Sequence, residues 1–395
     1  MAETSRTTTT GKARRRSVAP TDVEAFVERT IGEDLHARRV LALRNGVIGV
    51  LHAATLGVHA IGLGLSAALN TNSKHAIKQI DRLLSNAGID VWDLFEYWVP
   101  FVVAQRPEAV VVLDWTDFDK DDQTTLAAYL VTNHGRATPL MWMTVPKSEL
   151  KGQRNDHEDV VLGRLADVMP RGVRVTVLAD RAFGDQKLYA FLQELGWDYI
   201  IRFRECITVR DRHGTEMPAA DWVLPRGRAR MLKDVEVTAD RTRIPAFVCV
   251  HAKGMKDAWC IATSRADLGA AGVVSWYGRR FTIEETFRDA KDIRFGMALS
   301  STRISTPERR DRLLLLAAMA QALLTLLGAA SEAIGYDRLL KANTVKKRTH
   351  SLFRQGSYWF TALPNMDDAR LRPLMEAFSR IVAEHRVFRE IFAII

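Results

Sequence analysis

Residues 109–114 read Ala-Val-Val-Val-Leu-Asp, a continuous apolar run that ends in a carboxylate. A second strand-like run, Val-Arg-Val-Thr-Val-Leu-Ala, covers residues 173–179 and is followed at once by Asp180. Mainly apolar runs of this length are typical of strands that are buried on both faces of a sheet. Open α/β sheets keep their sites at the carboxyl ends of such strands, which makes Asp114 and Asp180 candidate site residues. An Asp after a strand is also a common turn former, and for either residue alone that interpretation is the stronger one.

The pattern around these two runs predicts an α/β core with a β-rich insertion and helical flanks. Two more strand-like runs, residues 126–132 and 139–145, and a helical stretch at 155–169 lie between them. Residues 197–265 alternate short strands with turns rich in Gly, Pro and charge, which predicts a separate β-rich unit. The chain is helical from Thr21, where Thr21-Asp22-Val23-Glu24 is a capping box, to about 106, and helical again after about 272.

Composition narrows the class of protein. The 395 residues are 47% hydrophobic and 26% charged, which excludes a fibrous or mostly disordered chain. Three cysteines without CxxC spacing exclude a disulfide framework and a cysteine-based zinc site, and they suit a reducing cytosol. The net charge of +9 favours a polyanionic partner, usually nucleic acid. Residues 45–73 and 313–330 are apolar enough to resemble membrane spans, but they are better interpreted as buried helices.

Basic residues gather in three places that suit contact with DNA phosphates. The tail before residue 20 carries +4 of the net charge and is either a solvated tail or a basic arm. Residues 73–84 form an amphipathic pattern with Lys74, Lys78 and Arg82 at i, i+4 and i+8, which predicts either a phosphate-binding stripe or a solvated face. Between residues 338 and 354 the cluster Lys346-Lys347-Arg348 is followed by aromatic residues, and here DNA contact is favoured over a flexible connector.

The segment from residue 276 to 296 carries the most specific pattern. On one continuous helix, a stripe about 80° wide would hold Tyr277, Arg280, Glu284, Arg288 and Lys291. A single acid among cations and a phenol suits a phosphodiester site, in which the acid holds metal and the cations grip the backbone. The alternative is a salt-bridged surface helix, and only the two strand-end acids favour the first interpretation.

These motifs resemble the insertion-sequence-four family of DDE transposases. The spacing Tyr277-x2-Arg280-x3-Glu284-x6-Lys291 is similar to the family's YREK signature. Asp180-Arg181-Ala182-Phe183-Gly184 resembles the motif around its second acid, and Asp114-Trp115-Thr116 resembles the motif around its first. The interval of 284 − 180 = 104 residues before the glutamate matches the family's habit of inserting a β-rich domain there.

The resemblance implies a ribonuclease H-like catalytic core with the triad Asp114, Asp180 and Glu284. It also implies two divalent metal ions, Mg²⁺ with Mn²⁺ as a substitute, held by those acids. The implied partners are double-stranded transposon ends and target DNA, bound by a homodimer on paired ends without any membrane. Trp259 is a candidate for stacking on a flipped base, with an ordinary aromatic of the sheet as the equal alternative. The residues implied or expected to contact DNA near the cut are Tyr277, Arg280, Arg288, Lys291 and Arg181.

The function expected from the resemblance is cut-and-paste transposition in a prokaryotic cytosol, associated with the nucleoid when DNA is bound. The alternatives are a catalytically silent DNA-binding descendant and another nuclease on the same core. The expected organisation is a disordered basic tail (1–20), a helical DNA-binding domain (21–106), the two parts of the core (107–190 and 272–330), the β-rich insertion (191–271) and a helical region for DNA contact and dimerisation (331–395).

Overall fold

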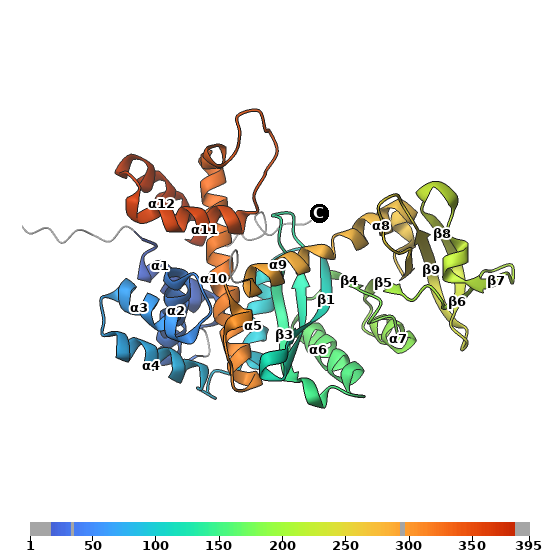
Figure 1. Ribbon diagram of the computed structural model, residues 1–395, viewed down its shortest axis with the longest axis horizontal. Coiled ribbons are helices and arrows are strands. Elements are labelled where there is room, and N and C mark those ends of the chain that lie inside the picture. The colour runs from blue at the N-terminus through green and yellow to red at the C-terminus, as the bar shows by residue number, and fades with distance from the viewer. Residues whose placement is uncertain (1–16, 33–34, 293–296, 384–395) are drawn as a thin grey trace, which may run out of the picture.

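A computed structural model describes residues 17–32, 35–292 and 297–383. One mixed sheet of ten strands crosses the molecule in the order β3-β2-β1-β4-β5-β10-β9-β8-β6-β7. The N-terminal helices lie at one end of the sheet and the strands of the insertion at the other, as Figure 1 shows. This mixed α/β architecture is consistent with the ribonuclease H-like core that the sequence predicts.

Five strands form the part of the sheet that carries the candidate site. They are β1 (Glu108–Phe118), β2 (Gln123–Leu130), β3 (Thr138–Pro146), β4 (Arg174–Ala179) and β5 (Asp198–Phe203). Strand β2 pairs antiparallel with both β1 and β3, whereas β4 and β5 run parallel to β1. Helices α6 (Arg154–Val168) and α7 (Gln186–Glu194) make the connections to the parallel strands, as parallel pairing requires. The apolar runs of β1 and β4 are buried, as their sequence predicts.

The strands of the insertion extend the same sheet. β10 (Trp259–Thr263) pairs antiparallel with β5, with Cys260 opposite Phe203. The remaining strands continue outward from it: β9 (Thr242–Val250), β8 (Arg230–Val237), β6 (Thr208–Arg210) and β7 (Glu216–Pro218). The strands of the predicted β-rich insertion therefore share backbone hydrogen bonds with the core sheet.

Helices flank the sheet at both ends of the chain. Before β1 come α1 (Pro20–Ile31), α2 (Ala37–Ala53), α3 (Val58–Leu69), α4 (Ser73–Leu84) and α5 (Val91–Val103). After the insertion come α8 (Gly269–Gly278), α9 (Phe281–Lys291), α10 (Pro307–Ala333), α11 (Leu352–Ala362) and α12 (Asp368–Ala383). Helix α10 is long and apolar enough to cross a membrane, but 83% of its apolar window is buried against the rest of the protein. The bent pair α2–α3 is long and apolar enough only if the two helices are counted together as one span.

Two helix predictions are wrong in detail. Helix α1 begins at Pro20 behind Ala19 and has no side-chain cap, so the capping box at Thr21 does not form. Proline at the first helical position needs no hydrogen-bond partner, and the N-cap lies at Ala19, two residues before Thr21. The predicted continuous helix from residue 276 is broken between α8 and α9 by tight turns at Arg279 and Arg280. The basic tail up to residue 16, residues 293–296 and the chain after residue 383 lie outside the described residues.

Candidate active site

Three carboxylates from three elements interact with one arginine, Arg280, near the carboxyl end of the parallel strands. The pairing of β1 with β4 ends at Val112 opposite Leu178, so Asp114 and Asp180 each lie two residues past the last pair. Equal offsets on neighbouring parallel strands place the two side chains on the same face of the sheet. Glu284 approaches from the first turn of α9, which lies over this part of the sheet (Figure 1).

Arg280 lies among the three acids. Its guanidinium is 3.6 Å from Asp114 Oδ2 and donates a hydrogen bond of 2.8 Å to Glu284 Oε1. The charge of Asp180 also acts on Arg280, which shows that this acid belongs to the same cluster. Only 8% of the Arg280 side chain is exposed, and its buried Nε has no hydrogen-bond partner within the part of the chain that the structure describes. One cation therefore faces three carboxylates, which leaves an excess of negative charge.

The pKa of the Asp114 carboxyl is raised in this environment. Burial raises the pKa of Asp114 from the ordinary 3.8 to about 6; Arg280 opposes that rise, whereas Asp180 and Glu284 add to it. A folded-state pKa above the unfolded one means that the neutral form stabilises the fold below pH 4, and that this stabilisation is lost as the pH rises through about 6.

We therefore expect Asp114→Asn to stabilise the metal-free protein in a pH-dependent way. Near pH 4 the variant and the wild type should unfold at the same temperature. At pH 7.5 the variant should gain about 3 kcal/mol, because it no longer carries the buried charge. Thermal unfolding in the presence of a chelator measures this difference, and a gain that does not change between pH 4 and pH 7.5 contradicts it.

The carboxylates have the oxygen donors that a hard divalent cation prefers. Within the described ranges of the chain, no three or more His, Cys, Asp or Glu side chains converge closely enough to form a metal site. The donor chemistry fits such an ion, and Arg280 supplies the positive charge among the acids in this structure.

The break between α8 and α9 changes the expected polar face. Tyr277 is 1% exposed and packs edge-on against Trp259, with ring centroids 4.8 Å apart. Tyr277 and Arg280, predicted on an open stripe, are thus both buried in the structure. Arg288 is exposed and pairs with Glu285, and the Lys291 ammonium donates to the Asp117 carbonyl at 2.8 Å.

The other predicted DNA contacts lie on three separate segments of the chain. Lys74, Lys78 and Arg82 are exposed on α4, and none has an ion-pair partner among the described residues. Lys346 and Lys347 are exposed in the segment between α10 and α11. Arg348 differs from them, because it forms a two-pronged pair with Glu332 and donates to the Asn133 carbonyl. Arg181 is exposed directly after Asp180.

Two features near the site have no counterpart in the sequence analysis. Phe281 is 42% exposed, lies over the Arg280 guanidinium at 4.9 Å and is tilted against Trp259. The sequence places Phe281 between the signature residues Arg280 and Glu284, but its exposure depends on the break between α8 and α9. Behind Asp114, the Trp115 indole donates to the buried Glu158 carboxylate at 2.8 Å.

Arg154 belongs to the same cluster as Trp115 and Glu158. It stacks over Trp115 and over Phe183 and lies 3.3 Å from Glu158. Because Trp115 follows Asp114 and Phe183 follows Asp180 by three residues, the cluster ties the two acid-bearing strand ends together. Residues 155–169 were predicted to be helical, but no local pattern indicates that Glu158 faces Trp115.

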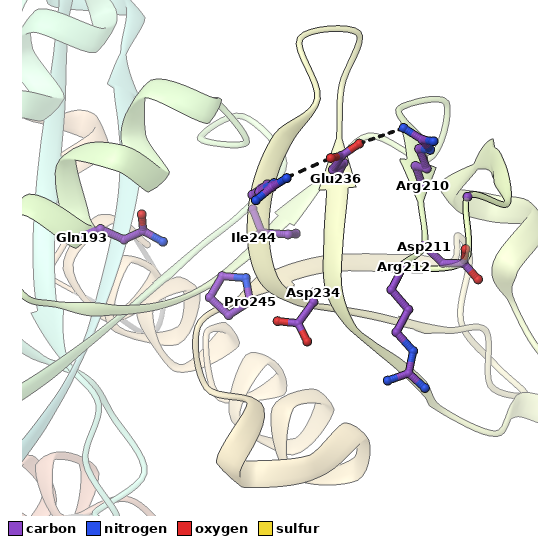
Figure 2. Close-up of a pocket in the computed structure, with 10 residues that line it drawn as sticks. Gln193, Arg210, Asp211, Arg212, Asp234, Glu236, Ile244 and Pro245 are labelled. Atoms are coloured by element: carbon purple, nitrogen blue, oxygen red, sulfur yellow. Dashed lines mark hydrogen bonds and ion pairs between the residues drawn. The ribbon is translucent and has the colours of Figure 1, made fainter.

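A cavity of about 570 Å³ lies on the insertion, separate from the carboxylates (Figure 2). Glu236 lies between Arg210 and Arg243 at 3.4 and 3.7 Å, which places a charge ladder across neighbouring strands at its wall. None of the three acids lines this cavity, so its size does not make it the reaction site.

The comparison with known protein families agrees with this geometry. Residues 106–323 match the family described as the transposase DDE domain, and the match includes Asp114, Asp180 and Glu284. No curated protein matches the chain. Since the matched region covers more than half of the 395 residues, the protein belongs to the transposase DDE domain family.

Proposed function

We propose that this transposase cuts and joins transposon ends by metal-dependent phosphoryl transfer, with Asp114, Asp180 and Glu284 as its catalytic acids. The observation that carries the proposal is the interaction of these three acids, from β1, the end of β4 and α9, with one buried arginine. Structural ion pairs rarely leave two negative charges uncompensated, whereas phosphoryl-transfer sites collect carboxylates for this purpose.

The three acids would hold two divalent ions, Mg²⁺ or Mn²⁺. When bound, such ions stabilise the charge that develops on the attacking and leaving oxygens of a phosphodiester. The protein's own task is to hold the acids in place. Arg280 fixes the side chains of Asp114 and Glu284 from one side, and the Trp115–Glu158 hydrogen bond fixes the end of β1 from the other.

Cations and aromatic rings around the acids would position the DNA. Arg181 beside Asp180, Arg288 on α9 and Lys291, whose charge acts on Asp114, would offer positive charge suited to phosphates. Tyr277 and Arg280 would support this contact from below, since both are buried. Trp259 and Phe281 form a half-exposed aromatic surface beside Glu284, and a base removed from the helix would stack there. This arrangement fits the YREK group within the family.

The N-terminal helices would bind the transposon end. Helices α3 and α4 are joined by residues 70–72, a connection length found in helix–turn–helix units. On α4, Asp81 is neutralised by Arg309, whereas Lys74, Lys78 and Arg82 have no ion-pair partner among the described residues. We assign this domain (21–106) and the basic segment with Lys346, Lys347 and Arg348 to end binding and to assembly of a dimer. The protein would act in the cytoplasm on the nucleoid.

The test uses a labelled linear duplex that carries the element's own end, taken from the DNA that flanks the coding frame. With Mg²⁺ we expect a nick at the end, followed by joining of the freed 3′-OH to another phosphodiester; without divalent metal we expect binding only. Binding without cleavage under Mg²⁺ and Mn²⁺ would indicate the silent descendant. Cleavage without any joining would indicate a nuclease. Either result overturns the proposal.

A further inference from the structure

Six exposed cations near the acid-bearing end of the sheet have no ion pair or side-chain hydrogen bond among the described residues. They are Arg181, Arg204, Arg226, Arg228, Lys253 and Lys256. We call this set the basic edge. Unpaired cations on a structured surface are a common mark of a polyanion-binding face.

The topology places the basic edge along one end of the sheet. Arg181 follows β4, and Arg204 follows β5, next to the pair of Phe203 with Cys260. Residues 251–258 connect β9 to β10 at this same end, because Val250 pairs with Trp259. Arg228 precedes β8, which begins opposite Cys249. The basic edge thus begins beside Asp180 and continues outward across the insertion.

The two outer loops are held in a fixed shape. Gly227 has φ +69°, and a Cβ at this position would lie 2.8 Å from the Ala252 Cα, so the loops touch through their backbones. Arg226 itself adopts φ +66°, a conformation that non-glycine residues rarely take. Arg202 donates to the Ala258 carbonyl at 3.0 Å and ties the second loop to β5. A loop fixed in this way presents its charges without further ordering cost.

Two cations at the opposite end of the same strands are neutralised. Arg174 pairs with Asp198 at 2.7 Å, and Arg265 pairs with Glu108 and Asp267 at 2.6 and 2.9 Å. Arg171 and Arg241 are exposed at that end without an ion pair among the described residues, so free cations occur at both ends, but the six of the basic edge lie at the end that carries the candidate catalytic acids.

We infer that the basic edge binds the phosphate backbone of the DNA duplex as it leaves the candidate active site toward the insertion. From β4 to β8 the sheet spans four strand spacings, or about 19 Å. That distance corresponds to roughly six phosphates along one strand of B-form DNA. The contact is to the backbone, so it is independent of sequence. The inference rests on the proposed function, because it takes the same DNA as its ligand.

The test measures the affinity of the full-length protein for a mixed-sequence duplex of about 40 base pairs, without divalent metal, over a series of salt concentrations. Two variants each remove two charges: Lys253→Gln with Lys256→Gln, and Arg204→Gln with Arg228→Gln. The matched control is Arg171→Gln with Arg241→Gln, which removes two exposed cations from the opposite end of the sheet.

Each basic-edge variant should bind on the order of tenfold more weakly near physiological salt, and its slope of log K against log salt should fall by about 1.8, the value for two lost phosphate contacts. The control should keep the wild-type slope. On a duplex that ends at the cleavage point, with no DNA toward the insertion, the difference between variants and control should vanish. Variants that match the control on the long duplex overturn the inference. A wild type that binds no DNA overturns the proposed function instead.

Discussion

Glu284→Gln is expected to lower the rate of strand cleavage by on the order of a thousandfold or more, because a neutral amide would hold a divalent ion less well than the carboxylate, and the ion would stabilise the charge that the reaction develops. The affinity for DNA without metal should stay within about twofold of the wild type, since the amide oxygen of the substituted side chain keeps the hydrogen bond from Arg280 and the surface shape is unchanged. The measurement is single-turnover cleavage of the labelled end duplex with Mg²⁺, set beside a binding titration without metal.

Glu285→Gln is the matched control for this substitution. Glu285 is the next residue of α9, has a similar exposure and turns away from the acid cluster to pair with Arg288, with Arg136 at 3.8 Å. The same chemical change there should leave cleavage within about threefold of the wild type, as expected for a surface ion pair of little energetic weight. Equal loss in both variants would show a general effect on the helix, and unchanged cleavage by Glu284→Gln would remove Glu284 from the proposed triad.

The sequence predicted the strand-end acids because their signal is local. Residues 109–114 and 173–180 each combine a buried strand with a terminal carboxylate, and parallel pairing then brings Asp114 and Asp180 to one level of the sheet. The family signature added Glu284, whose approach to the two strands no local pattern specifies. The apolar pattern of the two strands and the spacing of the family signature were therefore sufficient to select these three candidate acids.

The parts that the sequence did not predict depend on contacts between distant segments. A stripe drawn on a regular helix cannot include the turns at Arg279 and Arg280, which bury Tyr277 against Trp259 on another strand. The hydrogen bond between Trp115 and Glu158 joins residues 43 positions apart. The continuity of the sheet through β5 and β10 likewise depends on the pairing of Cys260 with Phe203, which no strand pattern specifies.

Gly356→Ala is expected to destabilise the fold by about 3 kcal/mol or more, because it forces backbone apart at the crossing of α10 and α11. A Cβ at Gly356 would lie 1.7 Å from the Leu324 carbonyl oxygen, and one at Gly328 would lie 2.0 Å from the Leu352 oxygen. No rotamer change relieves a clash between a Cβ and a backbone oxygen, so the helices must separate. Their separation would also pull Leu352 away from the His134 carbonyl, to which its amide donates at 3.2 Å.

Gly163→Ala tests whether that loss comes from the close approach or from the glycine itself. Gly163 lies inside α6 with no atom within 4 Å of a Cβ, so alanine there should stabilise the helix by roughly 1 kcal/mol. Thermal unfolding should therefore move in opposite directions, down by about 4 °C or more for Gly356→Ala and slightly up for Gly163→Ala. If Gly356→Ala left the unfolding temperature unchanged, α11 could not pack on α10 as closely as described. The basic segment that joins these helices would then not be held in place by their packing for its proposed contact with DNA.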